Sequence, residues 1–300
     1  TPSNTPPTGI WLYRVAHMSI YQADATVPTA GAAIRVQSDD GLTASMADVE
    51  DVFIHGTFRG FHGSALQGSS LKTLTIYATK DDGILWDVYQ TMVQAIGCWT
   101  YYCGQNGTGH GWHLQGPAYC TVTASGADSN YGWGWYVESG TVQAPRGNNF
   151  TVGAEQNRDG GILIKNAIGG VYSPMVVTPD DLPTAADGIV VDNGRMVGLV
   201  GAFTQQGAIG GTGYPLRITN GVPDYPSVTV NASYLNSYNT GSEYHQTIGI
   251  GTYLPWEERG FIGLNTDGKP RRMLDIHDRT GAAGNTTGHE LARLALHTSD

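Results

Sequence analysis

Gly161-Ile-Leu-Ile164-Lys165 and Gly188-Ile-Val-Val191-Asp192 contain the pattern that decides the fold of this chain. In both stretches a glycine stands three residues before an apolar side chain and four residues before a polar one. The last of nine such glycines lies 210 residues after the first, a mean spacing of about 26 residues; they are Gly31, Gly63, Gly83, Gly111, Gly134, Gly161, Gly188, Gly213 and Gly241. A loose repeat of this length is typical of solenoid proteins.

Each copy predicts a turn followed by a short strand. Side chains of a strand point alternately to its two faces. The third residue after the glycine is therefore expected in the core and the fourth in solvent. A second run rich in β-branched residues precedes most copies, as at residues 51–54, 73–76 and 149–152. Because these strands follow one another without amphipathic helices, the sequence predicts an all-β fold, a parallel β-helix of about nine coils.

The repeat also predicts how the chain is organised. Residues 1–14 are expected to be an N-terminal linker, residues 15–247 the β-helix, and residues 248–300 a small C-terminal cap or connector, because the apolar end of a solenoid must be covered. The signs of Glu138, Lys165, Asp192 and Arg217 alternate at the fourth position of successive copies. This alternation predicts a ladder of opposite charges, and the alternative is an ordinary polar surface.

Composition argues against several classes of protein and site. A net charge of −10 disfavours nucleic acid as a partner, because its phosphates require a basic surface. No run of 18 apolar residues occurs, so membrane insertion is not expected. Three cysteines give no disulfide framework, and Cys98 and Cys120, about one coil apart, are expected in the interior. No metal site and no cofactor are predicted, because Cys98 and Cys103 lack a second pair at zinc-ligand spacing.

Two neighbouring loops rich in aromatic residues are the predicted glycan-binding surface. Sugar rings have apolar faces that stack on aromatic rings, and their hydroxyls bond to polar side chains. The candidate residues are Tyr101, Tyr102, Asp128, Tyr131 and Trp133. The alternative is that these side chains pack within the loops or against another chain. Trp112 and Trp135, at odd offsets from their glycines, are expected to point into the core.

Carboxyl groups are the candidate catalytic residues. Glycoside hydrolysis needs two of them, and coils stacked about 4.8 Å apart can supply the separation. Glu155 and Asp159 share one loop and are the predicted pair. Asp82 is a further candidate, because it stands between His62 and His110 at the position before the glycine of three successive copies. Such a stack would suit acid–base chemistry, and the alternative is a structural role in turns.

The coil length, the Asp-Gly-Ile and Gly-Gly-Ile-Leu-Ile units and the polar aromatic loops resemble the pectin lyase-like right-handed β-helices, most of all phage tail spikes and tail fibres. Residues 263–271 resemble the connectors around such helices. The resemblance covers residues 15–247. It implies a right-handed coil and an extracellular, virion-borne homotrimer that binds a bacterial surface glycan and other tail proteins. Two alternatives stay open: an enzyme of the same fold that degrades polysaccharide, as a glycosidase or lyase, and a purely structural decoration or fibre-shaft protein.

Overall fold

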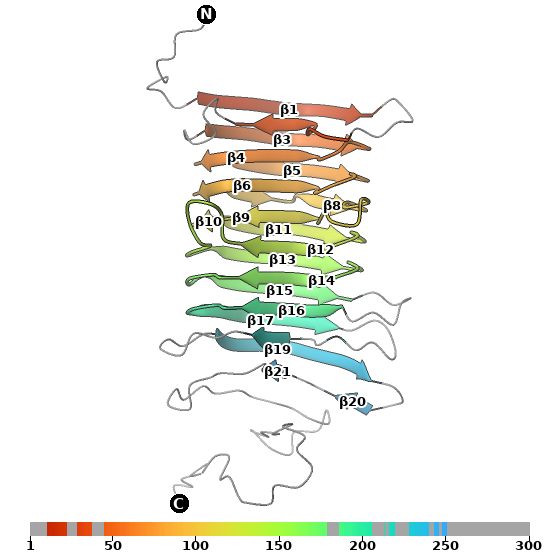
Figure 1. The fold of residues 1–300 in the computed structure, drawn as a ribbon, viewed down its shortest axis with the longest axis vertical. Helices are drawn as coiled ribbons and strands as arrows, with labels where there is room; N and C mark the ends of the chain where they lie inside the picture. The colour runs from red at the N-terminus through yellow and green to blue at the C-terminus, as the bar shows by residue number, and fades with distance from the viewer. Residues whose placement is uncertain are drawn as a thin grey trace, which may run out of the picture.

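The chain folds as a right-handed parallel β-helix, as the sequence predicts (Figure 1). The computed structural model describes residues 11–22, 29–37, 45–178, 186–205, 213, 216–219, 228–239, 243–245 and 248–250. Within these ranges every regular element is a strand, and none is a helix able to cross a membrane. The predicted C-terminal cap lies outside the described residues, except for the strand at residues 248–250.

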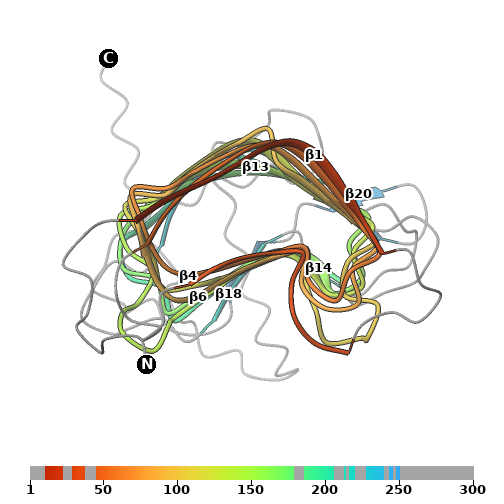
Figure 2. The ribbon, with the colours of Figure 1, turned by 90° about the horizontal axis from the view of Figure 1, so that it is seen from above.

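The strands form two stacks, because each strand pairs in parallel with a strand one coil away. The long-strand stack consists of β1 (Trp11–Tyr21), β3 (Ser45–His55), β5 (Ser70–Tyr77), β7 (Gln94–Ile96) with β8 (Trp99–Tyr101), β11 (Thr121–Asp128), β13 (Asn149–Glu155), β15 (Val171–Val177), β17 (Val197–Gln205) and β19 (Val228–Asn239). Viewed along the axis, these long strands arch over the second stack (Figure 2).

The short-strand stack consists of β2 (Ile34–Val36), β4 (Phe61–Gln67), β6 (Ile84–Thr91), β9 (Trp112–Gln115), β12 (Trp133–Glu138), β14 (Gly160–Lys165), β16 (Asp187–Asp192), β18 (Leu216–Thr219) and β21 (Ile248–Ile250). The short strand β10 (Pro117–Ala118) pairs with the end of β6, and β20 (Glu243–His245) runs antiparallel to β19. From β3 to β15 the chain is described without a break and makes about six turns. This number is somewhat lower than the nine coils that the sequence predicts.

The glycine repeat holds in the middle of the chain and slips at both ends. The residues after Gly83, Gly111, Gly134, Gly161 and Gly188 pair with one another from β6 to β16, so these glycines form one column. A Cβ atom at Gly83 would lie 2.7 Å from the carbonyl oxygen of Gly111, so the next coil excludes any side chain there.

The other four copies are out of register, which corrects the prediction. Phe61 pairs with Ile84, so the glycine of that coil is Gly60 and not Gly63. The copies that begin at Gly31, Gly213 and Gly241 are displaced as well. In these three coils the position directly after the glycine column is occupied by Ile34, Leu216 and Ile248.

The predicted charge ladder is correct for three of its four members. Lys165 stands opposite Asp192, and Glu138 occupies the corresponding end of the preceding strand β12. Arg217 instead pairs in register with Val190, and its guanidinium contacts Asp187. Thr219 takes the expected place of the arginine, and its hydroxyl donates to Asp192 Oδ1 at 2.9 Å.

The core between the stacks is apolar and has aromatic side chains at its centre. Trp112 and Trp135 are fully buried, as expected, and their rings stack with centroids 4.3 Å apart. Cys98 and Cys120 are buried free thiols, and burial raises their pKa values to about 11 and about 12. They do not stack on one another. Cys98 lies between β7 and β8, and its backbone N–H donates to Ser125, whereas Cys120 lies just before β11, and its backbone N–H donates to Asn148.

Candidate functional site

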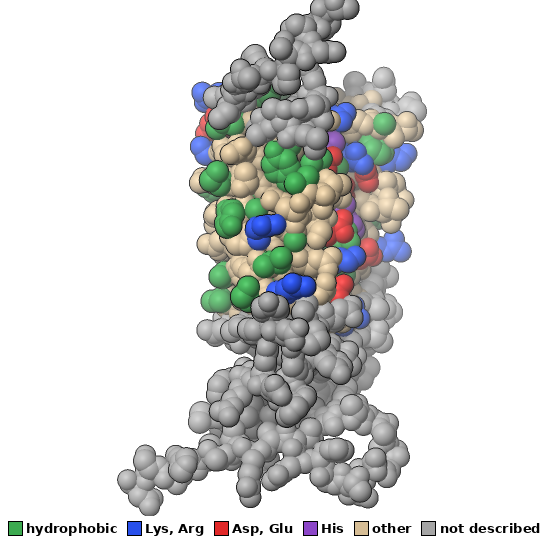
Figure 3. All heavy atoms as spheres, turned by 60° about the vertical axis from the view of Figure 1, so that its left-hand side comes forward, with side chains coloured by type: hydrophobic (Ala, Val, Ile, Leu, Met, Phe, Trp, Pro, Cys, Tyr) green, Lys and Arg blue, Asp and Glu red, His purple; other side chains and the backbone are tan. Residues whose placement is uncertain are grey.

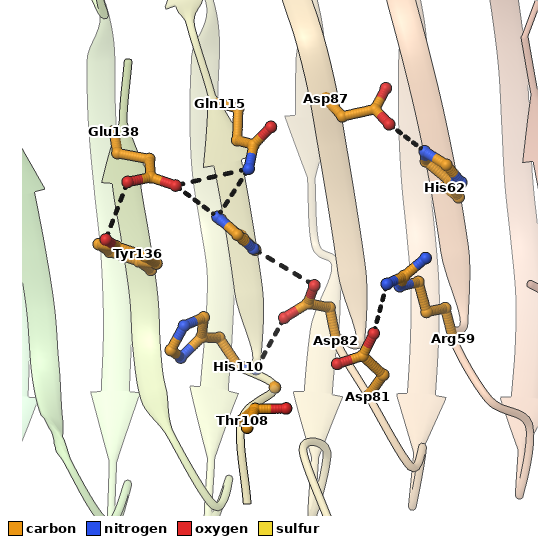
Figure 4. A network of polar contacts seen from close by, with 12 residues as sticks. Arg59, His62, Asp81, Asp82, Asp87, Thr108, His110, Gln115, Tyr136 and Glu138 are labelled. Atoms are coloured by element: carbon orange, nitrogen blue, oxygen red, sulfur yellow. Dashed lines mark hydrogen bonds and ion pairs between the residues drawn. The ribbon is translucent and has the colours of Figure 1, made fainter. Parts of the chain in front are cut away.

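Polar side chains from three successive coils meet on the outer face of the short-strand stack (Figure 4). Strict alternation produces this arrangement: in β9 the side chains of Trp112 and Leu114 are buried, so His113 and Gln115 face outward. By the same alternation, the side chains of Tyr136 and Glu138 point outward from β12. We call this surface the polar face; it consists of Asp82, His110, His113, Gln115, Tyr136 and Glu138.

His113 lies at the centre of the polar face, between two carboxylates. Its Nδ1 is 3.3 Å from Asp82 Oδ2, and its Nε2 is 3.0 Å from Glu138 Oε1. Burial alone would lower the pKa of this imidazole, but the hydrogen bonds to Asp82 and Glu138 outweigh it and raise the pKa to about 9. His113 is therefore an imidazolium at neutral pH, with both ring nitrogens donating.

Glu138 is held by three neighbours. The hydrogen bond from His113 is the main reason that its pKa is lowered, although burial acts in the opposite direction. The Tyr136 hydroxyl donates to Glu138 Oε2 at 2.8 Å, and the Gln115 amide lies 3.4 Å from Oε1. Burial and the hydrogen bond to Glu138 raise the pKa of Tyr136. Glu138 thus stays ionised at neutral pH, fixed in one orientation.

His110 is a neutral imidazole beside this charged group. Its backbone N–H donates to Asp82 Oδ1 at 2.8 Å, and its Nδ1 accepts the backbone N–H of Trp133 at 3.1 Å. Burial lowers the pKa of His110 to about 4, against the opposing effect of Asp82. Because Nδ1 is an acceptor, the single proton of the neutral ring sits on Nε2. The ring packs edge-on against Tyr136, with centroids 4.8 Å apart.

Three of these side chains also form the only group among the described residues that could hold a metal ion. Asp82, His110 and His113 each place one ligand atom within 4.8 Å of the others. The hydrogen bonds do not fit that use, because a ligating imidazole needs a free lone pair. His113 donates from both nitrogens, and the lone pair of His110 accepts the Trp133 N–H. The arrangement fits acid–base chemistry and sugar binding better than metal ligation.

The predicted stack of His62, Asp82 and His110 is correct only in part. Asp82 and His110 do occupy adjacent coils before their glycines, because the Gly83 N–H donates to the His110 carbonyl. His62 stands opposite Leu85, further along the strand, and its Nε2 is 2.7 Å from Asp87 Oδ2. The displaced register of Gly63 explains the error, and His113 supplies the second imidazole at Asp82.

The predicted glycan residues divide between two places. Tyr101 and Asp128 stand opposite one another at the ends of β8 and β11, and Glu155 follows in the same column at the end of β13. Burial and the charges of Asp128 and Glu155 raise the pKa of Tyr101. Tyr102, beside them, is 43% exposed and packs against Tyr77.

Tyr131, Trp133 and Asp159 lie closer to the polar face. Tyr131 is exposed in the turn before β12, and Trp133, at the start of β12, lies against Gly160. The Asp159 N–H donates to the Gly132 carbonyl at 3.3 Å, and burial raises the pKa of its carboxyl. The turn at residues 156–159 thus separates Asp159 from Glu155, which lies in the column with Asp128.

Sequence reasoning missed His113 and Tyr136, and it assigned Glu138 only to the charge ladder. The signal was present: His113 and Tyr136 each stand two residues after a glycine of the repeat, the outward position between two core positions. Comparison with known protein families, with curated proteins and with solved structures gave no match. The geometry of the polar face is therefore the basis for a functional proposal.

Proposed function

We propose that this β-helix binds a bacterial surface polysaccharide along its polar face, as an extracellular adhesin of a phage tail spike or tail fibre. The observation that carries the proposal is the ordered series of donors and acceptors on successive coils, centred on His113. The resemblance of the repeat to tail-spike β-helices adds support for a place in a virion beside other tail proteins.

A sugar hydroxyl both donates and accepts hydrogen bonds, so it suits a surface that offers both roles side by side. Carboxylate oxygens of Asp82 and Glu138 accept, while the Gln115 amide and the Nε2–H of His110 donate. The supporting strands repeat every 4.8 Å or so, which suits an extended polymer lying along the axis. Trp133, at the edge of this surface, offers an aromatic ring for stacking.

Trp133→Ala is expected to weaken binding of host envelope polysaccharide about tenfold, because it removes a stacking surface worth about 1.4 kcal/mol. Isothermal titration with the purified polysaccharide measures this change, and circular dichroism checks that the variant is folded. Tyr21→Ala is the matched control, since Tyr21 is 62% exposed at the far end of β1. Absence of binding by the unmodified protein to every host envelope polysaccharide would contradict the proposal.

A second candidate function is hydrolysis of the bound polysaccharide. Asp82 and Glu138 approach opposite sides of the His113 ring from coils two levels apart. Because His113 bridges the two carboxylates, at 3.3 Å from Asp82 and 3.0 Å from Glu138, hydrolysis at this site would use the imidazolium in place of the carboxylic acid of an ordinary glycosidase. His113 carries an exchangeable proton at neutral pH, and Glu138 is an ionised base, so the pair supplies an acid and a base together.

If the protein is a hydrolase, Glu138→Gln is expected to slow release of oligosaccharides about 100-fold, since a general acid or base contributes about 10²–10⁴ to rate. Glu155→Gln and Asp159→Asn test the pair predicted from the sequence and are expected to retain activity. Chromatography of the products measures all three rates. If Glu155→Gln and Asp159→Asn lose activity while Glu138→Gln retains it, the catalytic pair lies in the corner loops. If the unmodified protein releases no products, the protein binds the polysaccharide without cutting it.

The proposed assembly is a homotrimer. An exposed apolar ridge runs along the corner between the two stacks, with an arginine among its members; it comprises Met92, Tyr119, Arg146, Ile168 and Met196 (Figure 3). Methionine, tyrosine and arginine are the residue types enriched at protein interfaces. Arg146 gives the ridge one positive charge and the corner of Asp128 and Glu155 is acidic, so one copy can dock against the next.

Light scattering of the native protein is expected to give three times the chain mass of 31.9 kDa. A monomer at every concentration would contradict the proposed trimer. The alternative is a purely structural virion protein. In that case the side chains buried between subunits, and not in contact with a glycan, would include Tyr101, Tyr131 and Trp133.

A further inference from the structure

We infer that the polymer bound on the polar face is an uncharged polysaccharide. This inference rests on the proposed function and specifies its ligand class. It comes from the distribution of charge over the short-strand stack, where the cations lie close to carboxylates of the same surface. A charged polymer would have to break these pairs to gain a partner.

The ion pairs follow the stack from coil to coil. Arg59 bonds Asp81 at 2.5 Å, beside the polar face. His62 bonds Asp87 at 2.7 Å between the same two coils, further along β4 and β6. Further along, Arg217 contacts Asp187. Together with His113 between its two carboxylates, these pairs extend from β4 to β18.

Two further cations, on the strands of this surface, also lie near carboxylates. Arg35 is close enough to Asp87 to contribute to the lowered pKa of that carboxyl. Lys165 has the same effect on Glu138 and stands opposite Asp192 in the neighbouring strand. Neither cation is therefore isolated from negative charge, as an anion-binding site would require.

The count of charges supports the same conclusion. Counted over the described strands and the turns that precede them, seven carboxylates face seven cations, with His113 counted as charged and His62 left out, so this surface has no positive excess; the carboxylates are Asp81, Asp82, Asp87, Glu138, Asp159, Asp187 and Asp192. The neighbouring corner adds Asp128 and Glu155, and the whole chain carries −10. A polymer with a carboxylate on each sugar would approach a surface that repels it.

An uncharged polymer meets no such penalty. Hydroxyl groups can bond to both partners of an ion pair without breaking it, because carboxylates accept and imidazolium or guanidinium groups donate. The inference also restricts the chemistry of the second candidate function. β-Elimination requires a uronate, whose C5 proton is made acidic by a cation-bound or an esterified carboxyl group. A neutral polysaccharide without uronate residues has no such proton, so the corresponding cleavage is hydrolysis, with water adding across the glycosidic bond.

A matched pair of polymers tests the inference: polygalacturonate and its fully methyl-esterified form share one backbone and differ in charge. The test also includes three neutral polymers, dextran, mannan and galactan, and two acidic ones, hyaluronan and polysialic acid. We expect every binding polymer to be neutral. We also expect the Kd to change by less than about twofold between about 50 and about 500 mM sodium chloride, since no ion pair forms.

Lys165→Gln provides a second readout that does not depend on the sugar identity. It is expected to change the Kd of a neutral polymer by less than about twofold, because a hydroxyl loses at most one exposed contact. Preferential binding of acidic polymers, with a Kd that rises about tenfold with salt and with Lys165→Gln, would overturn the inference while leaving glycan binding intact. Binding to none of the polymers would overturn the proposed function and this inference with it.

Discussion

Trp112→Ala is expected to lower the free energy of unfolding by about 3–5 kcal/mol, the range for removing a buried tryptophan. Trp112 is fully buried between two other indole rings, at 6.2 Å from Trp86 and 4.3 Å from Trp135 between centroids. Its Nε1–H donates to the Gly126 carbonyl at 3.1 Å. Truncation therefore leaves a cavity beside the two neighbouring indole rings and removes one buried hydrogen bond, and the coils above and below cannot collapse into it without breaking their own ladder bonds.

Urea unfolding followed by tryptophan fluorescence and circular dichroism measures the loss. Trp112→Phe keeps one aromatic ring in the core but removes the second fused ring and its N–H, so it is expected to cost about 1–2 kcal/mol. Met175→Ala is the control, because Met175 is 63% exposed on β15 and should cost less than about 0.5 kcal/mol. A Trp112→Ala loss below about 1 kcal/mol would contradict the described core.

The sequence predicts the fold correctly where successive coils repeat the same short strand directly after a glycine. From Gly83 to Gly188 the same short strand recurs, and a Cβ at Gly111 would lie 2.7 Å from the carbonyl oxygen of Gly134. Steric exclusion thus makes glycine a reliable marker there. At the N-terminal end Gly60 occupies this position, and Gly63 lies inside β4 instead. A template anchored on any available glycine cannot distinguish the two.

The polar face was harder to predict, because it depends on contacts between coils. His113 follows Asp82 by 31 residues and precedes Glu138 by 25. These separations depend on the intervening loops, whose lengths vary between coils. Alternation along β9 and β12 predicts that His113 and Tyr136 face outward, but only the pairing register brings the ring of His113 between two carboxylates.

The free energy of unfolding is expected to be greatest near pH 6.5 and to fall on both sides, because the two histidines of the polar face have opposite pKa shifts. For His113 the folded pKa of about 9 lies above the unfolded value of 6.5. Its stabilisation is complete below pH 6.5 and is lost as the pH rises through 9. For His110 the folded pKa of about 4 lies below 6.5. Its stabilisation is complete above pH 6.5 and is lost as the pH falls through 4.

Each shift of roughly 2.5 pH units corresponds to about 3 kcal/mol, so both limbs are measurable by urea unfolding between pH 4 and pH 9. His113→Gln is expected to flatten the alkaline limb, because glutamine does not titrate while its amide can still donate to Glu138. His110→Asn is expected to flatten the acid limb and to keep an acceptor for the Trp133 N–H.

The two variants separate the histidines from other titrating groups. The acid limb also contains Glu138, whose lowered pKa adds stability that is lost in the same direction, so His110→Asn should leave a residual slope below pH 4.5. The alkaline limb has no comparable second source on the polar face, since burial and Glu138 raise the pKa of Tyr136 further and keep its hydroxyl protonated. Above about pH 8 the buried cysteine thiols, whose pKa values burial raises, add an alkaline slope of their own. A slope between pH 6.5 and about 8 that persists in His113→Gln would show that His113 is not held as an imidazolium between Asp82 and Glu138. The acid–base reading of the polar face would then fail with it.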